Sequence, residues 1–419
     1  MRRIKAEATR SLPITKAMVW LAYKKVKSNQ GSAGVDKVSL IQYQEDLLNN
    51  LYKLWNRLSS GSYFPPSVRE VLIPKQNGKK RKLGIPTVED RIAQQVMKSY
   101  LEPRLEIVFQ SNSYGYRPMK SAHQAVEAVR KNVRNYGWVL DMDIKSFFDE
   151  VDHGLLMKGL SCHVEEKWVK MYVKRWLEAP VRESDGHLRT KEGKGTPQGG
   201  VISPLLANLY LHYTLDEWLR RHYKQVPFVR YADDVILHCS SEAEAKAVLS
   251  SIRTRLQECG LRLNEDKTQI VYCQDYRRQK KDYRKKFDFL GFRFQPRSIR
   301  SENGGMFLGF GCAISPVARK RIAMKWRELK FHKWTTTTLV QIANEVNPIL
   351  RGIIHYYGRF GRWELEKVFR VLHFRLAKWV LNKYKRFGRS YAKAYGWLHK
   401  VRKDFPNLFY HWAIGYKTM

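Results

Sequence analysis

Two adjacent carboxylates interrupt an apolar run in the stretch RYADDVILHC, which spans residues 230–239. Neighbouring residues of a strand point to opposite faces, so Asp233 and Asp234 can serve one site only where the chain turns beside them. A turn with two exposed acids that bond their own backbone would explain the pair without any chemistry. At the tip of a hairpin, the same pair could hold Mg²⁺, which prefers hard oxygen ligands.

A third carboxylate could complete such a centre. In WVLDMDIKSFFDEVD (138–152), Asp141 and Asp143 alternate with apolar residues at the period of a strand. If that strand lies beside the hairpin tip, several carboxylates share one small volume, which is unfavourable unless cations compensate for their charge. Two divalent ions about 3.5–4 Å apart can stabilise the attacking and leaving oxygens of a phosphoryl transfer, whereas His or Cys ligands would select softer metals.

The elements that would position these acids follow from hydrophobic periodicity. Residues 68–87 are expected to form a β-hairpin with a basic turn, 228–239 a strand, a turn and a second strand, and 287–294 a further strand. Helical spacing predicts helices on both sides of a loop within 17–58 and in four further segments: 88–106, 121–135, 204–221 and 242–259. Because strands and helices interleave irregularly, the predicted fold class is α+β rather than a doubly wound parallel sheet.

The composition indicates a globular protein with a polyanionic partner. The 419 residues are 43% hydrophobic and carry a formal net charge of +38, so nucleic acid is the first candidate and an anionic membrane surface the second. The sequence has no run of 18 or more apolar residues, the length that would be needed to span a bilayer. The basic N-terminus is not followed by the apolar stretch of a secretory signal. Five widely spread cysteines without a C-x-x-C pair argue against disulfides and structural zinc and fit a reducing cytoplasm.

The character of the sequence changes from Ala313 onward. This segment has 23 Lys plus Arg against 5 Asp plus Glu and holds six of the twelve tryptophans, with helical periodicity. Basic helices with interleaved aromatics suit a groove that follows phosphates and stacks on bases. The alternative is an ordinary amphipathic bundle, and most of these Trp side chains are expected in its core. The basic block YRRQKKDYRKK (276–286) is expected to be a solvated loop rather than a docking site.

Seven ordered blocks give the chain a resemblance to a known family. YADD, DIKSFFD and GTPQGGVISPLLANLYL (195–211) are similar to the palm motifs of reverse transcriptases. Four more blocks complete the set, and all seven occur along the chain in the order this family uses: IPKQNGKKRKLGIPTVEDRIAQQ (73–95), SYGYRP (113–118), GLRLNEDKTQ (260–269) and FDFLGFRF (287–294). From about residue 20 to about residue 380, the chain most closely resembles the reverse transcriptases of bacterial group II introns, which also act as splicing maturases.

The resemblance implies a centre with two Mg²⁺ ions. The implied catalytic residues and metal ligands are Asp143, Asp233 and Asp234, with the backbone carbonyl of Ile144 as a further ligand. Asp233 would contact the ions more directly, and Asp234 would support the geometry of the primer end. Asp141 remains the alternative to Asp143, which is preferred because it places Phe148 five residues on, where the family has an aromatic steric gate that favours dNTPs. Phe147 is expected in the core.

The resemblance also implies substrate contacts. Lys75 and Arg81 resemble the residues of the fingers that close on the triphosphate, a role that suits ammonium and guanidinium groups. It stays open which basic residues of the hairpin contact the triphosphate, because three other lysines are nearby: Lys79, Lys80 and Lys82. Gln198 could bond near the nucleotide, and Gly199 and Gly200 would let the backbone approach it closely. Lys267 resembles a general acid near the leaving pyrophosphate, with a solvated surface lysine as the alternative.

One further residue and two further segments are also given roles. Arg117, in the block SYGYRP, is interpreted as a positional residue. The FLGF sequence (289–292) resembles the grip on the primer end, and LRGIIHYYGRF (350–360) is the most recognisable part of the family's helical thumb.

The implied organisation is that of a right-hand polymerase. Fingers and palm are expected in 1–310, a helical thumb or maturase X domain in 311–380, and a basic extension that is a candidate for DNA binding in 381–419. Many relatives end in an H-N-H endonuclease with paired cysteines, and this domain is expected to be absent because no cysteine follows Cys312.

The implied function is RNA-directed DNA synthesis by a protein encoded in a group II intron. It would bind the intron RNA to assist splicing, and support retrohoming by target-primed cDNA synthesis. The alternatives are a maturase that acts mainly as an RNA-binding splicing cofactor, and a domesticated relative in defence or repair. The expected partners are intron RNA, an RNA template, a DNA primer, dNTPs and target DNA, without a membrane. Dimerisation in the absence of RNA and a bacterial, nucleoid-associated cytoplasmic location are further expectations.

Overall fold

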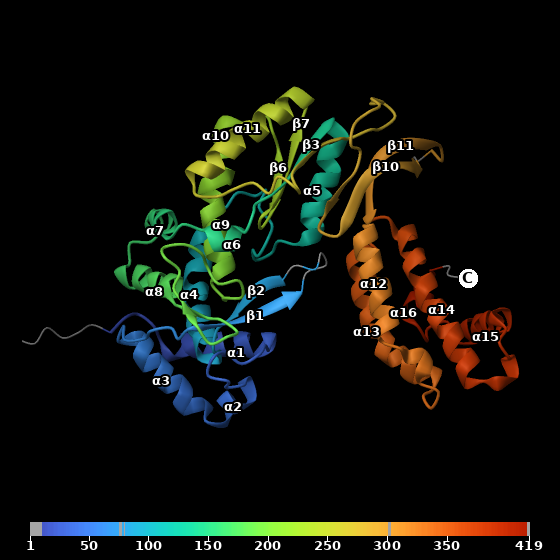
Figure 1. Cartoon of the computed structure of the whole chain (residues 1–419), viewed down its shortest axis with the longest axis horizontal. Coiled ribbons are helices and arrows are strands. Elements are labelled where there is room, and N and C mark those ends of the chain that lie inside the picture. The colour runs from blue at the N-terminus through green and yellow to red at the C-terminus, as the bar shows by residue number, and fades with distance from the viewer. Residues whose placement is uncertain (1–10, 75–77, 79, 301–302, 417–419) are drawn as a thin grey trace, which may run out of the picture. The chain divides into compact units, whose positions relative to one another are not determined.

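The computed structural model describes residues 11–74, 78, 80–300 and 303–416 of the chain (Figure 1). The chain divides into two compact units. The first comprises Met1–Ser121, Asp141–Leu237 and Ala243–Gln269, and the second comprises Ala122–Leu140, His238–Glu242 and Ile270–Met419. Helices accompany three small sheets with mainly antiparallel pairings, which confirms the predicted α+β class.

A four-stranded sheet carries the two stretches with the predicted acids. Its strand order is β6-β7-β3-β8. The strands are β6 (Phe228–Tyr231), β7 (Asp234–Cys239), β3 (Trp138–Asp143) and β8 (Gln269–Tyr272). β6 and β7 pair antiparallel, so the predicted strand–turn–strand is confirmed. β3 covers the predicted alternation up to Asp143, and the short helix α6 (Phe147–Glu150) begins after Ser146, which has a φ of 48°.

The predicted basic hairpin is confirmed in a second sheet with the order β2-β1-β4-β5. Its strands are β1 (Val68–Pro74), β2 (Lys80–Ile85), β4 (Val181–Arg182) and β5 (Leu188–Arg189). The helices of this part of the chain are α1 (Lys16–Asn29), α2 (Leu40–Glu45), α3 (Leu47–Ser59), α4 (Val88–Glu106), α7 (His153–Ser161) and α8 (Lys167–Glu178). The predicted helix at 88–106 coincides with α4.

The predicted helix at 204–221 contains a turn that the sequence did not indicate. It consists of α9 (Ser203–Leu211), the π-helical segment η1 (His212–Asp216) and α10 (Glu217–His222). Pro204 lies in the first turn of α9, where a backbone N–H would have no partner within the helix, so the N–H that proline lacks is not needed. The helix predicted at 242–259 is α11 (Glu242–Glu258).

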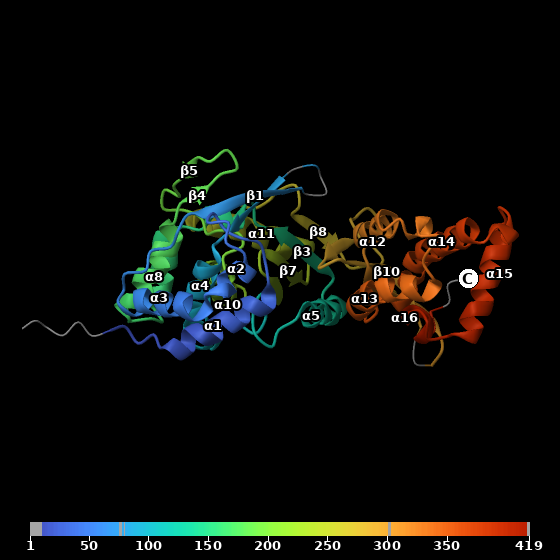
Figure 2. The same ribbon diagram turned by 90° about the horizontal axis from the view of Figure 1, so that it is seen from below.

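The second unit combines the helix α5 (Ala122–Asn135), a sheet of order β11-β10-β9 and a group of helices (Figures 1 and 2). The strands are β9 (Phe287–Phe289), β10 (Phe292–Arg300) and β11 (Met306–Ile314). The α-helices are α12 (Pro316–Glu328), α13 (Leu339–Tyr357), α14 (Glu366–Lys383), α15 (Tyr391–Asp404) and α16 (Tyr410–Ala413). Short 3₁₀ turns join them: η2 (Phe331–Lys333), η3 (Arg362–Leu365) and η4 (Lys385–Phe387).

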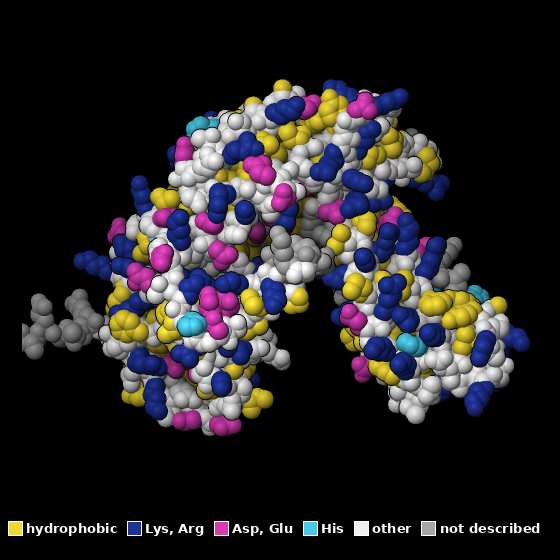
Figure 3. Space-filling view, viewed as in Figure 1, with side chains coloured by type: hydrophobic (Ala, Val, Ile, Leu, Met, Phe, Trp, Pro, Cys, Tyr) yellow, Lys and Arg dark blue, Asp and Glu magenta, His cyan; other side chains and the backbone are white. Residues whose placement is uncertain are grey.

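Half of the six tryptophans of this helical group are buried, so the expectation that most of them lie in the core is met only in part. Trp326, Trp379 and Trp412 are buried, whereas Trp363 is 55% exposed. Lys and Arg side chains are spread over the visible face of both units (Figure 3). Among the described residues, no helix combines the length and the apolar character needed to cross a bilayer.

Trp379→Ala is expected to lower the free energy of unfolding by about 3–5 kcal/mol, because it empties a fully buried site on α14. The substitution also removes an indole N–H that donates to the Trp334 carbonyl at 2.9 Å. Urea denaturation of the full chain would measure the loss. The matched control is Trp363→Ala on η3, for which a change within about 0.5 kcal/mol is expected. Equal losses in the two variants would contradict this account of the core.

Candidate active site

The two adjacent acids lie at the tip of the β6–β7 hairpin. Tyr231 pairs with Asp234, so Ala232 and Asp233 form a two-residue turn. Ala232 has a φ of 57°, in the left-handed region that non-glycine residues rarely adopt and that costs about 1–2 kcal/mol. The turn must therefore be held by its surroundings, and it brings Asp233 and the first residue of β7 to one edge of the sheet.

Asp143, at the end of β3, lies close enough to interact with both acids. Desolvation raises the pKa of Asp234 to about 7, and the charges of Asp233 and Asp143 add to this rise. Desolvation also raises the pKa of Asp233, and the Asp143 charge contributes in the same direction. Asp234 keeps access to solvent although protein surrounds much of its carboxylate. The structure thus brings the three predicted carboxylates together.

Lys267 is a cation that the structure places against this cluster. Its Nζ lies 3.0 Å from Asp143 Oδ2, which also accepts a hydrogen bond of 2.8 Å from Asn264 Nδ2. Partial burial works to lower the pKa of Lys267, but the bond to Asp143 and the charges of the three aspartates outweigh it and raise the pKa. Asn264 is a contact that the sequence reasoning missed, although it lies in the block GLRLNEDKTQ that supplied Lys267.

Asp141 has a different environment from Asp143. Its Oδ2 accepts a hydrogen bond of 2.6 Å from Gln269 Nε2. Asp143 is the one of the two whose charge raises the pKa of both Asp233 and Asp234. The geometry therefore favours Asp143 as the partner of the hairpin tip.

The segment after β3 is fixed by the block that carries Lys267. Ile144 and Leu263 form an antiparallel bridge. The Asn264 N–H donates to the Asp143 carbonyl at 2.8 Å, and the Lys145 N–H donates to the Arg262 carbonyl at 2.8 Å. These two bonds do not use the carbonyl of Ile144, whose role as a metal ligand stays a prediction.

The basic hairpin and the TPQGG loop meet in one contact. Arg81 Nε, on β2, donates to Gln198 Oε1 at 2.7 Å, and the Gly84 N–H donates to the Gln198 carbonyl at 2.6 Å. Gly199 has a φ of 116°, and a Cβ there would collide with the Gly84 carbonyl, so this position requires glycine. Two predicted substrate residues, 117 positions apart, thus lie side by side.

The other predicted lysines of the hairpin differ in their surroundings. Lys82 is engaged, because its Nζ lies 3.3 Å from Glu70 and 3.6 Å from Glu183. Lys80 is exposed at the start of β2. Lys75 and Lys79 lie outside the described residues.

Electrostatic interactions connect the hairpin with the carboxylates. Burial raises the pKa of Tyr116, the Asp233 charge adds to the rise, and Arg81 opposes it. Arg81 and Lys267 both act to lower the pKa of Asp233. The anionic tip and the cationic hairpin therefore belong to one site. Tyr116, from the block SYGYRP, is a member of it that the sequence reasoning did not single out.

The two phenylalanines after Asp143 are both buried. Phe147 packs edge-to-face on Phe148, with centroids 5.4 Å apart, and lies 6.4 Å from the ring of Tyr210. The Phe148 carbonyl accepts a hydrogen bond of 2.7 Å from the Thr196 N–H, which ties α6 to the TPQGG loop. Phe147 belongs to the core as expected, and the role of Phe148 as a gate stays a prediction.

Arg117 and the FLGF turn have structural partners. Arg117 is buried and bonds Glu106 at 2.6 Å and the Ser113 carbonyl at 2.8 Å. Leu290 and Gly291, both with positive φ, form the turn between β9 and β10, and Tyr356 Oη donates to the Leu290 carbonyl at 2.9 Å. The grip on a primer end stays a prediction.

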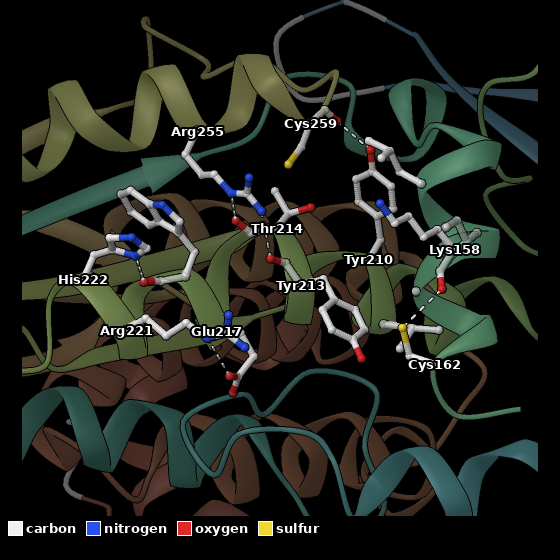
Figure 4. A pocket seen from close by; sticks show the side chains of 15 residues that line it. Lys158, Cys162, Tyr210, Tyr213, Thr214, Glu217, Arg221, His222, Arg255 and Cys259 are labelled. Atoms are coloured by element: carbon white, nitrogen blue, oxygen red, sulfur yellow. Dashed lines mark hydrogen bonds and ion pairs between the residues drawn. The ribbon is translucent and has the colours of Figure 1, made fainter.

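A cavity of about 490 Å³ lies apart from these residues (Figure 4). Side chains of α7, α9, η1, α10 and α11 line it, among them Tyr213, Glu217 and Arg255, together with Cys162 directly after α7. None of the predicted site residues lines this cavity.

Two family models match the chain. Residues 73–294 match "Reverse transcriptase (RNA-dependent DNA polymerase)", and residues 319–396 match "Group II intron, maturase-specific domain". The first match covers more than half of the chain.

The relatives agree with these matches. The chain is 36% identical to "Protein YkfC" of Escherichia coli over 279 residues, which is 58% of this chain and 73% of that protein. It is 34% identical to "Group II intron-encoded protein LtrA" of Lactococcus lactis over 196 residues, which is 46% of this chain and 32% of that protein. A Candida albicans telomerase structure aligns over 90% of this chain and 68% of that chain, with 14% identity and a TM-score of 0.43. The chain belongs to the reverse transcriptase family, among the members that carry a group II intron maturase domain.

Proposed function

We propose that this protein extends a DNA primer along an RNA template and that it also binds a group II intron RNA to assist splicing. The observation that carries the polymerase proposal is the convergence of three carboxylates, from β3 and from the β6–β7 tip, beside Lys267 and Arg81. The match of residues 319–396 to the maturase-specific domain supports the splicing role.

The donor set fits Mg²⁺. Carboxylate oxygens are hard ligands, and the mutual repulsion of three such groups is what divalent cations relieve. We assign two ions to Asp143, Asp233 and Asp234, with the Ile144 carbonyl as a further oxygen. Bound Mg²⁺ would supply charge stabilisation to the attacking and leaving oxygens of the transfer. As the side chains stand, no group of three or more His, Cys, Asp or Glu residues among those described could hold a metal ion, and the Lys267 ammonium faces Asp143.

The surrounding side chains have distinct proposed tasks. Arg81 and, from outside the described residues, Lys75 would hold the triphosphate, while Gln198 orients the Arg81 guanidinium. The primer 3′-hydroxyl gives up its proton to solvent as its oxygen forms the new bond to the α-phosphorus, and the bond from that phosphorus to the pyrophosphate oxygen breaks. Lys267, whose raised pKa keeps it protonated, would give its proton to that leaving oxygen. The Phe148 ring would exclude a ribose 2′-hydroxyl.

We assign fingers and palm to residues 1–310, the thumb to 311–380 and a basic extension to 381–419. The proposed partners are intron RNA, RNA template, DNA primer, dNTPs and target DNA, the last in retrohoming. Dimerisation without RNA and a nucleoid-associated cytoplasmic location stay predictions. The chain spans about a third of the Lactococcus relative, so these activities are proposed for this chain on its own residues.

The test combines two assays on the full chain. With an RNA template, an annealed DNA primer, dNTPs and Mg²⁺, we expect primer extension that stops when a chelator is added. With the intron RNA found beside the coding sequence, we expect faster splicing. Extension in excess chelator would overturn the metal assignment. Splicing without any extension would favour a maturase that acts only as an RNA-binding cofactor, and flanking DNA without a group II intron would favour a domesticated relative.

Arg81→Ala is expected to raise the KM for dNTPs by about 10- to 150-fold, since a hydrogen bond to a charged group contributes about 1.5–3 kcal/mol. Steady-state extension on a fixed template would measure the change. Lys80→Ala, on the neighbouring position of β2, is the control and is expected to have a smaller effect. A larger effect of Lys80→Ala would indicate that Lys80 contacts the triphosphate and would contradict the assignment of this contact to Arg81.

A further inference from the structure

A buried arginine lies two residues before Ala232, the first residue of the turn at the two acids. Arg230, on β6, and Asp216, at the end of η1, are both fully buried. Arg230 Nε donates to Asp216 Oδ1 at 2.7 Å, and Nη2 donates to Asp216 Oδ2 at 2.5 Å. Taking two charges out of water is costly, and a buried ion pair offsets that cost only if its remaining donors also find partners.

The remaining nitrogen of this guanidinium reaches the turn. Arg230 Nη1 donates to the Ala232 carbonyl at 3.2 Å and to Asn208 Oδ1 at 3.0 Å. Ala232 is the residue with the unfavourable left-handed φ, and Asp233 and Asp234 follow it. One rigid, planar group therefore connects a helix of the first unit to the strained turn.

The opposite side of the turn is closed by the block SYGYRP. Asn208 Nδ2 donates to the Gly115 carbonyl at 2.8 Å, and the Tyr114 N–H donates to the Arg230 carbonyl at 2.8 Å. A Cβ on Gly115 would collide with the backbone nitrogen of Ala232. The turn thus has little room to move between the guanidinium and the Gly115 backbone.

The π-helical segment explains how both partners of Arg230 face it. In a regular α-helix, positions i and i+7 share a face. Asn208 and Asp216 are eight positions apart, and the wider turn of η1 takes up the additional residue. Arg255, on the cavity side, donates to the carbonyls of Thr214 at 3.1 Å and Tyr213 at 3.2 Å, which stabilises η1 (Figure 4).

We infer that Arg230 is a positioning residue: together with Asp216 and Asn208 it fixes the turn so that Asp233 and Asp234 are preorganised to bind divalent cations. This inference rests on the proposed function, because it concerns the same carboxylates. Groups that orient metal ligands typically contribute about 10- to 100-fold to metal affinity or activity. Arg230 touches neither substrate nor metal in this role.

The test uses Arg230→Lys, which keeps the positive charge beside Asp216 but loses the planar fork. Mn²⁺ serves as the probe, and the electron paramagnetic resonance signal of free Mn²⁺ reports its binding to the full chain with an RNA template and DNA primer. We expect Mn²⁺ affinity to fall at least about 10-fold while the affinity for the template–primer duplex stays unchanged. Mn²⁺ affinity equal to that of the unmodified chain would overturn the inference, even if the melting temperature falls.

The matched control is Arg278→Lys. Arg278 also bonds an aspartate, Asp275 at 2.6 Å, and a backbone carbonyl, that of Val133 at 2.9 Å, but it does not contact the turn. The Mn²⁺ affinity of the Arg278→Lys variant is expected to remain unchanged. A fall equal to that of Arg230→Lys would mean that the Arg230 effect is only general destabilisation of the protein.

Gly115→Ala decides the matter if Arg230→Lys does not fold. This variant keeps the Arg230–Asp216 pair and displaces the turn directly, so a fall in Mn²⁺ affinity supports the inference and an unchanged affinity overturns it. The Mn²⁺ readout does not need catalysis. If the unmodified chain binds Mn²⁺ but never extends a primer, the proposed polymerase function fails while the test of Arg230 remains interpretable.

Discussion

Asp233→Ala is expected to slow primer extension by about 10³-fold or more and to leave the affinity for the template–primer duplex nearly unchanged. The reason is that a metal ligand contributes several kcal/mol of charge stabilisation in the transition state, and each 1.36 kcal/mol corresponds to a factor of ten in rate. Single-turnover extension with saturating dNTP measures the step itself, and a fluorescence titration with labelled duplex measures binding.

The aspartates of β3 provide the discriminating controls. Asp143→Ala should lose as much activity as Asp233→Ala, because both are assigned to the ions. Asp141→Ala should keep most activity, since its carboxylate bonds Gln269 instead. An inactive Asp141 variant beside an active Asp143 variant would reverse the choice of the first ligand.

Splicing separates the two proposed activities. A double substitution of Asp233 and Asp234 by Ala should abolish cDNA synthesis and spare the stimulation of intron splicing, because the maturase match lies in residues 319–396. Persistent cDNA synthesis in that variant would show that the metal assignment is wrong.

The affinity for RNA is expected to fall by about 10³- to 10⁵-fold between about 50 and 200 mM salt, if roughly 6–10 phosphates are contacted. The formal net charge of +38 is the physical reason, since each neutralised phosphate releases counterions and the release is opposed by added salt. Filter binding of intron RNA over a series of KCl concentrations gives the slope of log affinity against log salt. A flat dependence would contradict recognition through the phosphate backbone.

A single arginine of the helical group offers a residue-level check. Arg370 is exposed on α14, one turn before Phe374, which is 46% exposed and stacks on Tyr391 with centroids 5.3 Å apart. If this face binds RNA, Arg370→Gln should reduce the slope by about 0.7–0.9, the contribution of one phosphate. Arg104→Gln is the control, because Arg104 is paired with Glu166 at 2.5 Å.

The hairpin with the adjacent acids was predictable because its information is local. Alternating apolar residues on both sides of Ala232 and Asp233 specify two strands and a turn, and β6 and β7 have that register. The convergence of Asp143 on this turn joins positions 90 residues apart in the sequence. It could be expected only through the resemblance of the motifs, not through periodicity.

The network around Arg230 was not predictable from the sequence. An arginine at the end of an apolar strand has no local feature that distinguishes a buried ion pair from a solvated side chain, and its partner Asp216 lies in a different element. The π turn of η1 was missed for a similar reason, since its residues have ordinary helical preferences.

The basic block 276–286 was partly anticipated. It forms a loop, as expected, but Arg277 and Arg278 bond Asp275 at 2.9 and 2.6 Å, and Arg278 also donates to the Val133 carbonyl. The beginning of the loop is therefore anchored rather than fully solvated, because a buried acid two and three residues away, on the same segment, binds both guanidinium groups.

The π turn also has a consequence for how this protein tolerates changes in length. The loss of one residue within 212–215 would let η1 relax into regular helix and leave Asn208 and Asp216 seven positions apart, which in a regular helix is still one face. Asp216 would therefore keep facing Arg230. The same loss within a regular helix such as α4 would turn everything after it by about 100°, so a one-residue deletion in η1 is expected to be tolerated better.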